Sequence, residues 1–386
     1  MIWQTNRRTV LAGGMALGAV ALTGAGPASG NGELVYIGTH ASKIFAARFD
    51  AKTGDLALIG QVSENARPTW AVNHPKLPIV YFNEDNTNQG KGPGGVQALA
   101  IDRASGALTK RSDVRSGGIG TTNLWFDRAS NTILGVNYGG AQIFAMAVGR
   151  DGTLGEIASS VQVSGSGPGQ RQISAHPHGV ALDPSGRWVV VADLGADRLW
   201  IFPFDRATRQ IGTDYSANSR HVVLPPGTGP RHFAFHPNGR WLYLVEELTA
   251  NVSTFAWDAK AGRLKVLQTL STDDPAFTGT RSAAEVAVSR DGRFVYVSNR
   301  SDHALVVHAI DPKSGKLTQL QRIPSGGPLP WHFSLHSSGK WLIVANRDAE
   351  ALAVFQVNPR SGLLRDSGKR MTVPKPVFAG FTGILN

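Results

Sequence analysis

The chain has 386 residues, of which 45 are glycine and 21 are proline, while 41% are hydrophobic and 17% are charged. This composition is rich in turn formers yet apolar enough for a core, which excludes a disordered protein and argues against a helical one. Cysteine is absent, so disulfide frameworks, thiolate metal sites and cysteine nucleophiles are excluded. The formal net charge of +11 suits an anionic partner of any size, from a small acid to nucleic acid.

Residues 1–30 have the three-part layout of an export signal. Arg7 and Arg8 directly precede a weakly apolar stretch that runs from Val10 to about Ala25 and ends in small residues. The paired arginines and the moderately hydrophobic middle resemble the twin-arginine class, which exports folded proteins. The stretch is short of the roughly 20 strongly apolar residues that a membrane span needs. We therefore expect this segment to be removed, leaving no membrane anchor, and the protein to be periplasmic or secreted.

Two sequence patterns recur through the rest of the chain. The first is Asp-x-x-x-Gly-x-Leu with substitutions, which is typical of a tight hairpin; its copies end 46 to 57 residues apart, at Leu56, Leu108, Leu154, Ile211, Leu264, Leu317 and Leu364. The second is a turn followed by an apolar strand; its copies begin at His74, Asp127, Asp183, His236, Arg290 and His336, with a shortened first copy at Val35–Thr39. Each pattern occurs seven times.

A period near 50 residues, with several β-branched or aromatic strands and tight turns in each unit, is typical of a propeller blade. Helical solenoid repeats are shorter and would show a 3.6-residue period, which is absent. We predict an all-β, seven-bladed β-propeller with four antiparallel strands per blade, as a single domain over residues 31–386. A strand from Val373 to Phe378 is expected to pair with the strand near Tyr36, closing the ring in one blade and protecting its edges. The closed ring favours a monomer.

The repeat also predicts which residues surround one mouth of the central channel. In each blade, the start of the innermost strand and the end of the second strand lie at the same mouth. The turn that joins these strands is counted from Asp127, Asp183, His236, Ser289 and His336. Five residues before these positions stand Thr122, His178, Arg231, Ala284 and Trp331, and eleven residues after them stand Tyr138, Leu194, Glu247, Arg300 and Arg347. We therefore expect His178, Arg231, Glu247 and Arg300 to converge as catalytic residues. Tyr138, Trp331 and Arg347 are expected to bind the substrate beside them.

These residue types suffice for chemistry on an anionic ester or lactone. Glu247 or His178 can take a proton from water or from a carbon, while the planar forks of the arginines hold a carboxylate or phosphate and stabilise an oxyanion. The competing interpretation is that they are solvated rim groups or a structural ion pair. No metal site is expected at His176 and His178. The sequence has no Gly-x-Ser-x-Gly motif, phosphate-binding loop or dinucleotide-binding motif placed between an expected strand and an expected helix.

Six segments, in order along the chain, resemble the lactonase family of seven-bladed propellers, which includes bacterial 6-phosphogluconolactonase and the fungal carboxymuconate-lactonizing enzyme. They are His176–Val180, Asp193–Asp197, Gly229–His232, Glu247–Leu248, Ala284–Val286 and Ser298–Arg300. The resemblance implies that His178, Arg231, Glu247 and Arg300 match the family's acid/base and anion-binding positions. It also implies a lactone hydrolase with 6-phosphogluconolactonase-like activity, a small anionic or sugar lactone as substrate, and no metal or organic cofactor. In that hypothesis Glu247, assisted by His178, activates water.

The sequence departs from the family pattern at two positions. Trp331 stands where the family usually has an arginine after proline, so an indole replaces an anion-binding group. Glu246 stands where asparagine usually precedes the glutamate, which is expected to add negative charge beside the base. Export also separates the protein from a phosphosugar made in the cytoplasm.

Two other functions stay open. One is a non-catalytic periplasmic binding or scaffold propeller, and the other is a cycloisomerase acting on an unsaturated dicarboxylate. Nucleic acid is not an expected partner, because the basic residues are spread through the turns of all seven blades.

Overall fold

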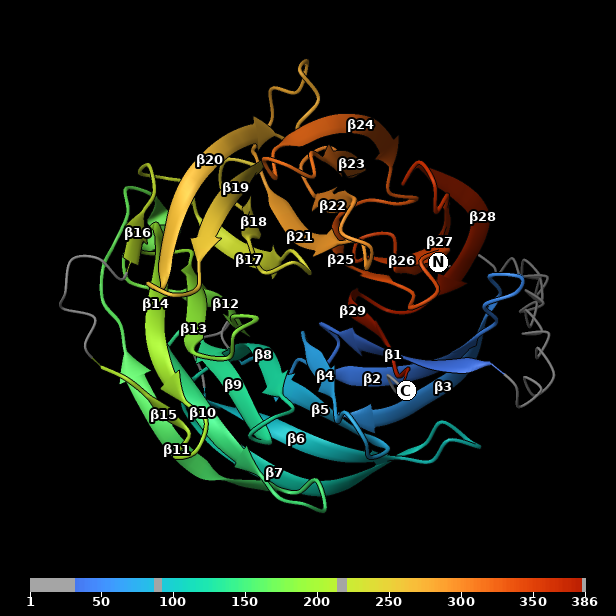
Figure 1. The fold of residues 1–386 in the computed structure, drawn as a ribbon. Coiled ribbons are helices and arrows are strands. Elements are labelled where there is room, and N and C mark those ends of the chain that lie inside the picture. Colours follow the sequence, from blue (N-terminus) through green and yellow to red (C-terminus); the bar gives the residue numbers. More distant parts are fainter. Residues whose placement is uncertain (1–31, 87–91, 214–220, 384–386) are drawn as a thin grey trace, which may run out of the picture.

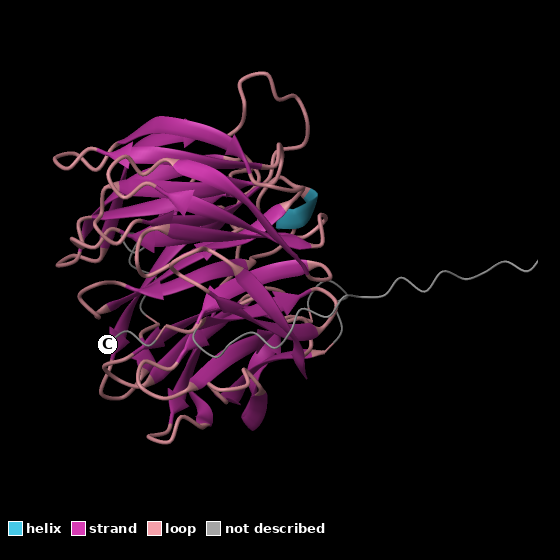
Figure 2. Cartoon of the chain, turned by 90° about the vertical axis from the view of Figure 1, so that its right-hand side faces the viewer, coloured by secondary structure: helices cyan, strands magenta, loops and turns pink. Residues whose placement is uncertain are grey.

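The structure, a computed structural model, describes residues 32–86, 92–213 and 221–383. Within these ranges the chain forms seven antiparallel sheets arranged in a ring around a central axis (Figure 1), as the repeat predicted. In side view the sheets are stacked around the ring, and a short 3-10 helix (η2, Gln170–Gln172) lies at one face (Figure 2). The predicted export signal lies outside the described residues. In the described ranges no helix has the length and hydrophobicity to cross a membrane.

We number the blades in chain order and give their strands from the channel outward. Blade 1 has β29 (Pro376–Phe381), β1 (Glu33–Thr39), β2 (Lys43–Phe49) and β3 (Leu56–Glu64). Blade 2 has β4 (Ala71–Asn73), β5 (Ile79–Glu84), β6 (Pro93–Ile101) and β7 (Leu108–Ile119). Blade 3 has β8 (Thr121–Asp127), β9 (Thr132–Asn137), β10 (Gln142–Val148) and β11 (Leu154–Gln162).

Blade 4 has β12 (Pro177–Leu182), β13 (Trp188–Asp193) and β14 (Arg198–Asp205), with β15 (Gln210–Ile211) and β16 (His221–Val223) both pairing with β14. Blade 5 has β17 (Pro230–Phe235), β18 (Trp241–Glu246), β19 (Asn251–Asp258) and β20 (Arg263–Ser271). Blade 6 has β21 (Ala283–Val288), β22 (Phe294–Asn299), β23 (Ala304–Ile310) and β24 (Leu317–Pro324). Blade 7 has β25 (Pro330–Leu335), β26 (Trp341–Asn346), β27 (Ala351–Val357) and β28 (Leu364–Thr372).

The two ends of the chain close the ring in blade 1, as predicted. Strand β29 pairs with β1 in antiparallel register, with Gly380 opposite Tyr36. The closing strand begins at Pro376 and ends at Phe381, a few residues later than the predicted range. The reason is that Val373 continues the end of blade 7, where its amide donates to the carbonyl of Glu350.

Neighbouring blades are joined by buried apolar side chains and by a repeated hydrogen bond. Between blades 7 and 1, for example, Ile343 packs with Val35 in one buried cluster. A tyrosine of the second strand donates its hydroxyl to the glycine carbonyl of the outer hairpin in the next blade; the pairs are Tyr36 with Gly106, Tyr81 with Gly152, Tyr243 with Gly315, and Tyr296 with Gly362. The two repeated sequence patterns therefore supply the two halves of the same joint.

Glycine is required in these hairpins. Gly315 has φ of +74°, and a Cβ added there would lie 2.4 Å from the ring of Trp241 in the preceding blade. A side chain at this position would be strained in its backbone and would also clash with the neighbouring blade.

Candidate active site

A β-bulge in the innermost strand directs one side chain of several blades into the channel mouth. In blade 4, Pro177 pairs with Asp193 and Gly179 with Ala192, so His178 is the extra residue. The same two-residue step leaves Thr122, Arg231 and Trp331 as the extra residues of β8, β17 and β25. Bulges re-aim side chains at the edges of sheets and next to active sites. This irregularity therefore explains why the five-residue count located one ring of mouth residues.

A second ring is fixed by a backbone hydrogen bond that recurs from blade to blade. The amide of the first residue after each second strand donates to a carbonyl just before the innermost strand. The pairs are Tyr138 with Gly120 at 2.9 Å, Glu247 with Gly229 at 2.7 Å, Arg300 with Ser282 at 2.7 Å, and Arg347 with Leu329 at 3.0 Å. This bond holds the end of one strand beside the start of the other, so side chains from both positions share the same mouth.

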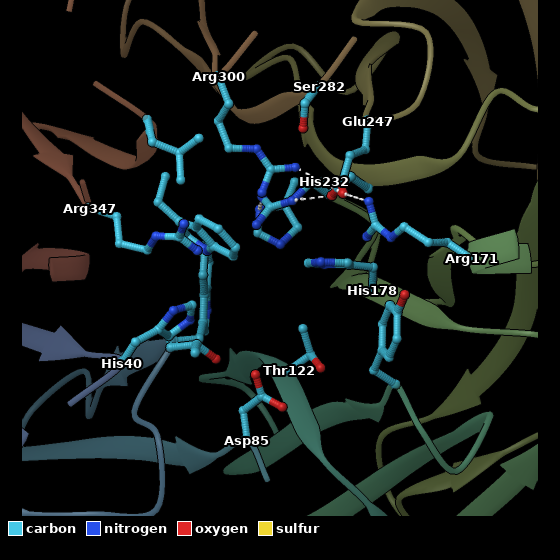
Figure 3. A pocket seen from close by; sticks show the side chains of 16 residues that line it. His40, Asp85, Thr122, Arg171, His178, His232, Glu247, Ser282, Arg300 and Arg347 are labelled. Carbon is cyan, nitrogen blue, oxygen red and sulfur yellow. Dashed lines mark hydrogen bonds and ion pairs between the residues drawn. The ribbon is translucent and has the colours of Figure 1, made fainter. Parts of the chain in front are cut away.

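The two rings enclose a pocket of about 400 Å³ (Figure 3). All seven residues expected from the sequence line it, namely Tyr138, His178, Arg231, Glu247, Arg300, Trp331 and Arg347. Ala284 and Leu194, which the same counts produced, do not line it. The carbonyl of Ala284 instead accepts from Arg231 Nη1 at 2.6 Å, and Leu194 is completely buried.

The carboxylate of Glu247 is held by guanidinium groups from different elements. Arg231 Nε lies 3.0 Å from Oε2, Arg300 Nη2 lies 2.9 Å from Oε1, and Arg171 Nη1 also contacts Oε1. Figure 3 shows Arg171 reaching Glu247 from the side of the pocket opposite Arg347. Burial raises the pKa of Glu247, but the fields of Arg300, Arg171 and Arg231 outweigh it and hold the pKa well below its usual range. Glu247 is therefore ionised and weakly basic.

His178 differs from Glu247 in charge, although the pKa of each is lowered. It is buried, and its ring lies beside the phenol of Tyr138, with the ring centroids 5.6 Å apart and the planes nearly perpendicular. Burial, together with the positive charge of Arg231, lowers the pKa of His178 well below its ordinary value, although Glu247 opposes the shift. The imidazole is therefore neutral near pH 7 and can accept a proton, and the adjacent carboxylate can stabilise the cation that forms.

Aromatic and histidine side chains form the floor of the pocket. The indole of Trp70 lies edge-on to the rings of His232 and His332, with centroids 4.9 and 5.3 Å apart. Below the pocket, His232 Nδ1 lies 2.9 Å from Glu285 Oε2, and both residues are buried. Burial raises the pKa of Glu285, while His332 and Arg231 oppose the shift. This layer separates the mouth pocket from the lower part of the channel.

The two departures from the family pattern have different positions. Trp331 lines the pocket, and the guanidinium carbons of Arg300 and Arg347 lie 4.6 and 4.9 Å from its ring centroid, so the indole supports cations by cation–π contact. The expectation that Glu246 adds charge beside the base is wrong. Glu246 is not part of the pocket lining; its carboxylate turns into the blade, because strand residues alternate in direction, and accepts hydrogen bonds from Thr249, Asn251 and Ser253.

Several pocket residues escaped the sequence reasoning. Thr69 and Asp85 stand five residues before and eleven after His74, so the same count applied to blade 2 would have found both. Arg171 lies in an irregular loop outside the repeat, and no sequence signal marked it. Within the described ranges, no group of three or more histidine, aspartate or glutamate side chains is arranged to hold a metal ion.

Comparisons with known proteins agree with this geometry. The family described as "Lactonase, 7-bladed beta-propeller" matches residues 34–381. A 6-phosphogluconolactonase of Bacillus subtilis is 29% identical over 302 residues, covering 77% of this chain and 83% of the relative. A 6-phosphogluconolactonase of Formosa agariphila is 26% identical over 312 residues, with 79% and 86% covered. The solved structure of a periplasmic gluconolactonase from Pseudomonas aeruginosa is 29% identical, with a TM-score of 0.84 over 91% of this chain and 99% of the other. The chain belongs to the lactonase family of seven-bladed β-propellers.

Proposed function

We propose that the protein is a lactonase that hydrolyses a sugar lactone or a related acidic lactone in the mouth pocket, in the manner of a 6-phosphogluconolactonase. Family membership and the names of the relatives support the reaction class. One observation carries the proposal: the neutral imidazole of His178 lies in the same pocket as the ionised Glu247 and the buried guanidiniums of Arg231 and Arg300. A base, a stabilising anion and oxyanion donors are thus close together.

Hydrolysis adds water across the ring ester bond. In our proposal His178 accepts a proton from the attacking water as its oxygen bonds to the lactone carbonyl carbon. The imidazolium then gives that proton to the ring oxygen as the C–O bond breaks, and the product is a hydroxy acid that ionises. Glu247 has both oxygens engaged by arginines, so its role is to stabilise the imidazolium and to orient the guanidiniums. General acid–base catalysis of this kind contributes about 10²–10⁴-fold.

Arginines supply the oxyanion donors. Arg300 is buried, and within the described chain its Nε has no hydrogen-bond partner, although Nη2 is engaged by Glu247 and by the carbonyl of Ala283. Arg231 is anchored in the same way by Glu247 and Ala284. Such fixed donors act without reorganisation when charge develops on the carbonyl oxygen, and loss of one donor typically costs about 10²–10³ in kcat.

The charge of the pocket and the predicted export suggest which lactones to try first. Four arginines, Arg171, Arg231, Arg300 and Arg347, and two carboxylates, Asp85 and Glu247, are among the lining residues, so positive charge predominates. That excess favours an acidic lactone or an anionic product. We also propose that residues 1–30 direct export and that the mature protein is a periplasmic monomer. The periplasmic gluconolactonase among the solved relatives supports this location, where unphosphorylated sugar lactones are the more accessible substrates.

The test is a panel of phosphorylated and unphosphorylated sugar lactones followed by pH-stat, with the uncatalysed rate subtracted. We expect the wild-type protein to hydrolyse at least one of them and His178→Asn to lose about 10²-fold or more in kcat. Arg150→Ala is the matched control, because Arg150 is exposed in the turn after β10, at the opposite face. Absence of hydrolysis above background for every lactone, with saturable binding of the same compounds, would favour the scaffold function instead. Formation of an unsaturated dicarboxylate, without addition of water, would favour the cycloisomerase.

A further inference from the structure

Arg171 is built into the pocket by a loop that does not follow the repeat. It lies in η2, within the connection between β11 and β12. The next residue, Gln172, is completely buried and donates from Nε2 to the carbonyl of Leu194 at 2.8 Å and to Asp197 Oδ1 at 2.7 Å. The backbone amide of Gly167 also donates to the Gln172 carbonyl at 2.8 Å. The backbone that carries Arg171 is therefore held in place, while the arginine side chain extends from it into the pocket.

The side chain of Arg171 differs from those of the other guanidiniums on Glu247. It is 53% exposed, whereas those of Arg231 and Arg300 are 3% and 5% exposed. Arg231 also donates to the backbone carbonyl of Ala284, and Arg300 to that of Ala283, and these hydrogen bonds hold the two guanidiniums in place. Arg171 reaches Glu247 from the solvent side and shares Oε1 with Arg300. Arg171 also interacts with the side chain of Tyr138, and of the three guanidiniums on Glu247 it is the one that solvent or a ligand entering the pocket can reach.

We propose that Arg171 binds the carboxylate that lactone opening creates, leaving Glu247 as that carboxylate forms. This inference rests on the proposed lactonase function. Ring opening converts a neutral ester into an anion with two oxygens, which matches the planar fork of a guanidinium in bidentate geometry. Glu247 keeps its ion pairs with Arg231 and Arg300 throughout, so its carboxylate stays ionised and its negative charge stays balanced. The ligand class is a hydroxy-carboxylate such as an aldonate, and Arg171 distinguishes it from the uncharged lactone.

The experiment compares binding of the product with use of the substrate. Gluconate is titrated by calorimetry into wild type, Arg171→Ala, Arg171→Lys and the control Arg150→Ala, and KM and kcat are measured with δ-gluconolactone. We expect Arg171→Ala to weaken gluconate binding by about 10- to 100-fold, as loss of hydrogen bonds to a charged group does. KM for the neutral lactone should change by less than about fivefold. The gluconate affinity of Arg171→Lys should be intermediate, because lysine keeps the positive charge but lacks the planar guanidinium that binds a carboxylate through two hydrogen bonds. Arg150→Ala should behave as wild type.

Unchanged gluconate affinity in Arg171→Ala would overturn the inference. Equal loss of gluconate and lactone affinity, with a lowered melting temperature, would also overturn it, because that result describes a structural ion pair. These outcomes differ from a failure of the proposed function, in which the wild-type protein itself hydrolyses no lactone.

Discussion

Replacing Glu247 by glutamine removes the carboxylate that the buried arginines share, and the structure predicts a cost in stability. The side chains of Arg231 and Arg300 are 3% and 5% exposed. Removing one partner of a buried ion pair typically destabilises a protein by about 3–5 kcal/mol, because the remaining charge is uncompensated. An unfolding entropy of about 2.1 cal/mol/K per residue over about 350 residues is roughly 0.7 kcal/mol/K. Glu247→Gln should therefore lower the melting temperature by about 4–7 °C.

The same reasoning predicts that anions restore the variant. Burial and the charge of Arg300 lower the pKa of Arg231 to about 10 in the presence of Glu247, which opposes the shift. Guanidinium groups stay protonated in proteins at neutral pH, so in Glu247→Gln the charge of Arg231 has lost its counterion. A small anion at a hundred times its Kd adds about 2.7 kcal/mol, which corresponds to about 4 °C on the scale above. The melting temperature of Glu247→Gln should rise more in phosphate than that of the wild type, measured against chloride at equal ionic strength.

The control for this measurement is Glu156→Gln, because Glu156 is exposed on outer strand β11. It should change the melting temperature by less than about 1 °C in any anion, in line with ordinary surface substitutions. If Glu247→Gln melts like Glu156→Gln, or if its loss of stability is the same in chloride and phosphate, the picture of Glu247 as the shared counterion of Arg231 and Arg300 is wrong.

Two further predictions concern the fold. Burial lowers the pKa of His308 from 6.5 to about 4. Below pH 6.5 this histidine is therefore protonated in the unfolded chain, whereas in the folded chain it stays neutral down to about pH 4. The free energy of unfolding is expected to fall as the pH falls from about 6.5 to about 4. Compared by urea unfolding at pH 7.5 and pH 5, His308→Leu should gain about 2 kcal/mol relative to wild type at the lower pH; a difference that does not change with pH would contradict this. In the same assay, Gly315→Ala should lower the free energy of unfolding by about 1–3 kcal/mol more than Gly368→Ala. Both glycines have φ of +74°, but a Cβ at Gly315 would lie against Trp241, whereas a Cβ at Gly368 would have no atom within 4 Å. Equal costs would show that backbone strain alone is at work.

The seven blades could be predicted because each repeated pattern forms a tight turn through hydrogen bonds between residues close together in the sequence. Histidine and aspartate alternate at the same turn position since both accept backbone amides there: His236 Nδ1 accepts from the amide of Asn238, and Asp183 accepts from those of Ser185 and Arg187. A count from such a turn carries over from blade to blade, which explains why the mouth residues were found by arithmetic.

The contacts inside the pocket could not be predicted in this way. Counting placed Glu247 beside Arg231, but it could not indicate that both carboxylate oxygens are occupied by arginines, which is the reason we propose His178 as the proton acceptor. Arg171 was missed because its loop is irregular and is held by contacts of Gln172 that have no repeat. Glu246 was misplaced because adjacency in sequence was taken for adjacency in space at the end of a strand.

Chemical rescue tests most directly whether His178 takes the proton from the attacking water. His178→Ala leaves a space the size of an imidazole beside Glu247. With δ-gluconolactone, or whichever lactone of the panel the wild type hydrolyses fastest, the variant should lose about 10²-fold or more in kcat. Added imidazole should restore the rate in a saturable way, after subtraction of its effect without enzyme and with Arg150→Ala as the control. Full activity of His178→Ala without imidazole, or a loss that imidazole does not reverse in a variant that still binds gluconate, would contradict the account.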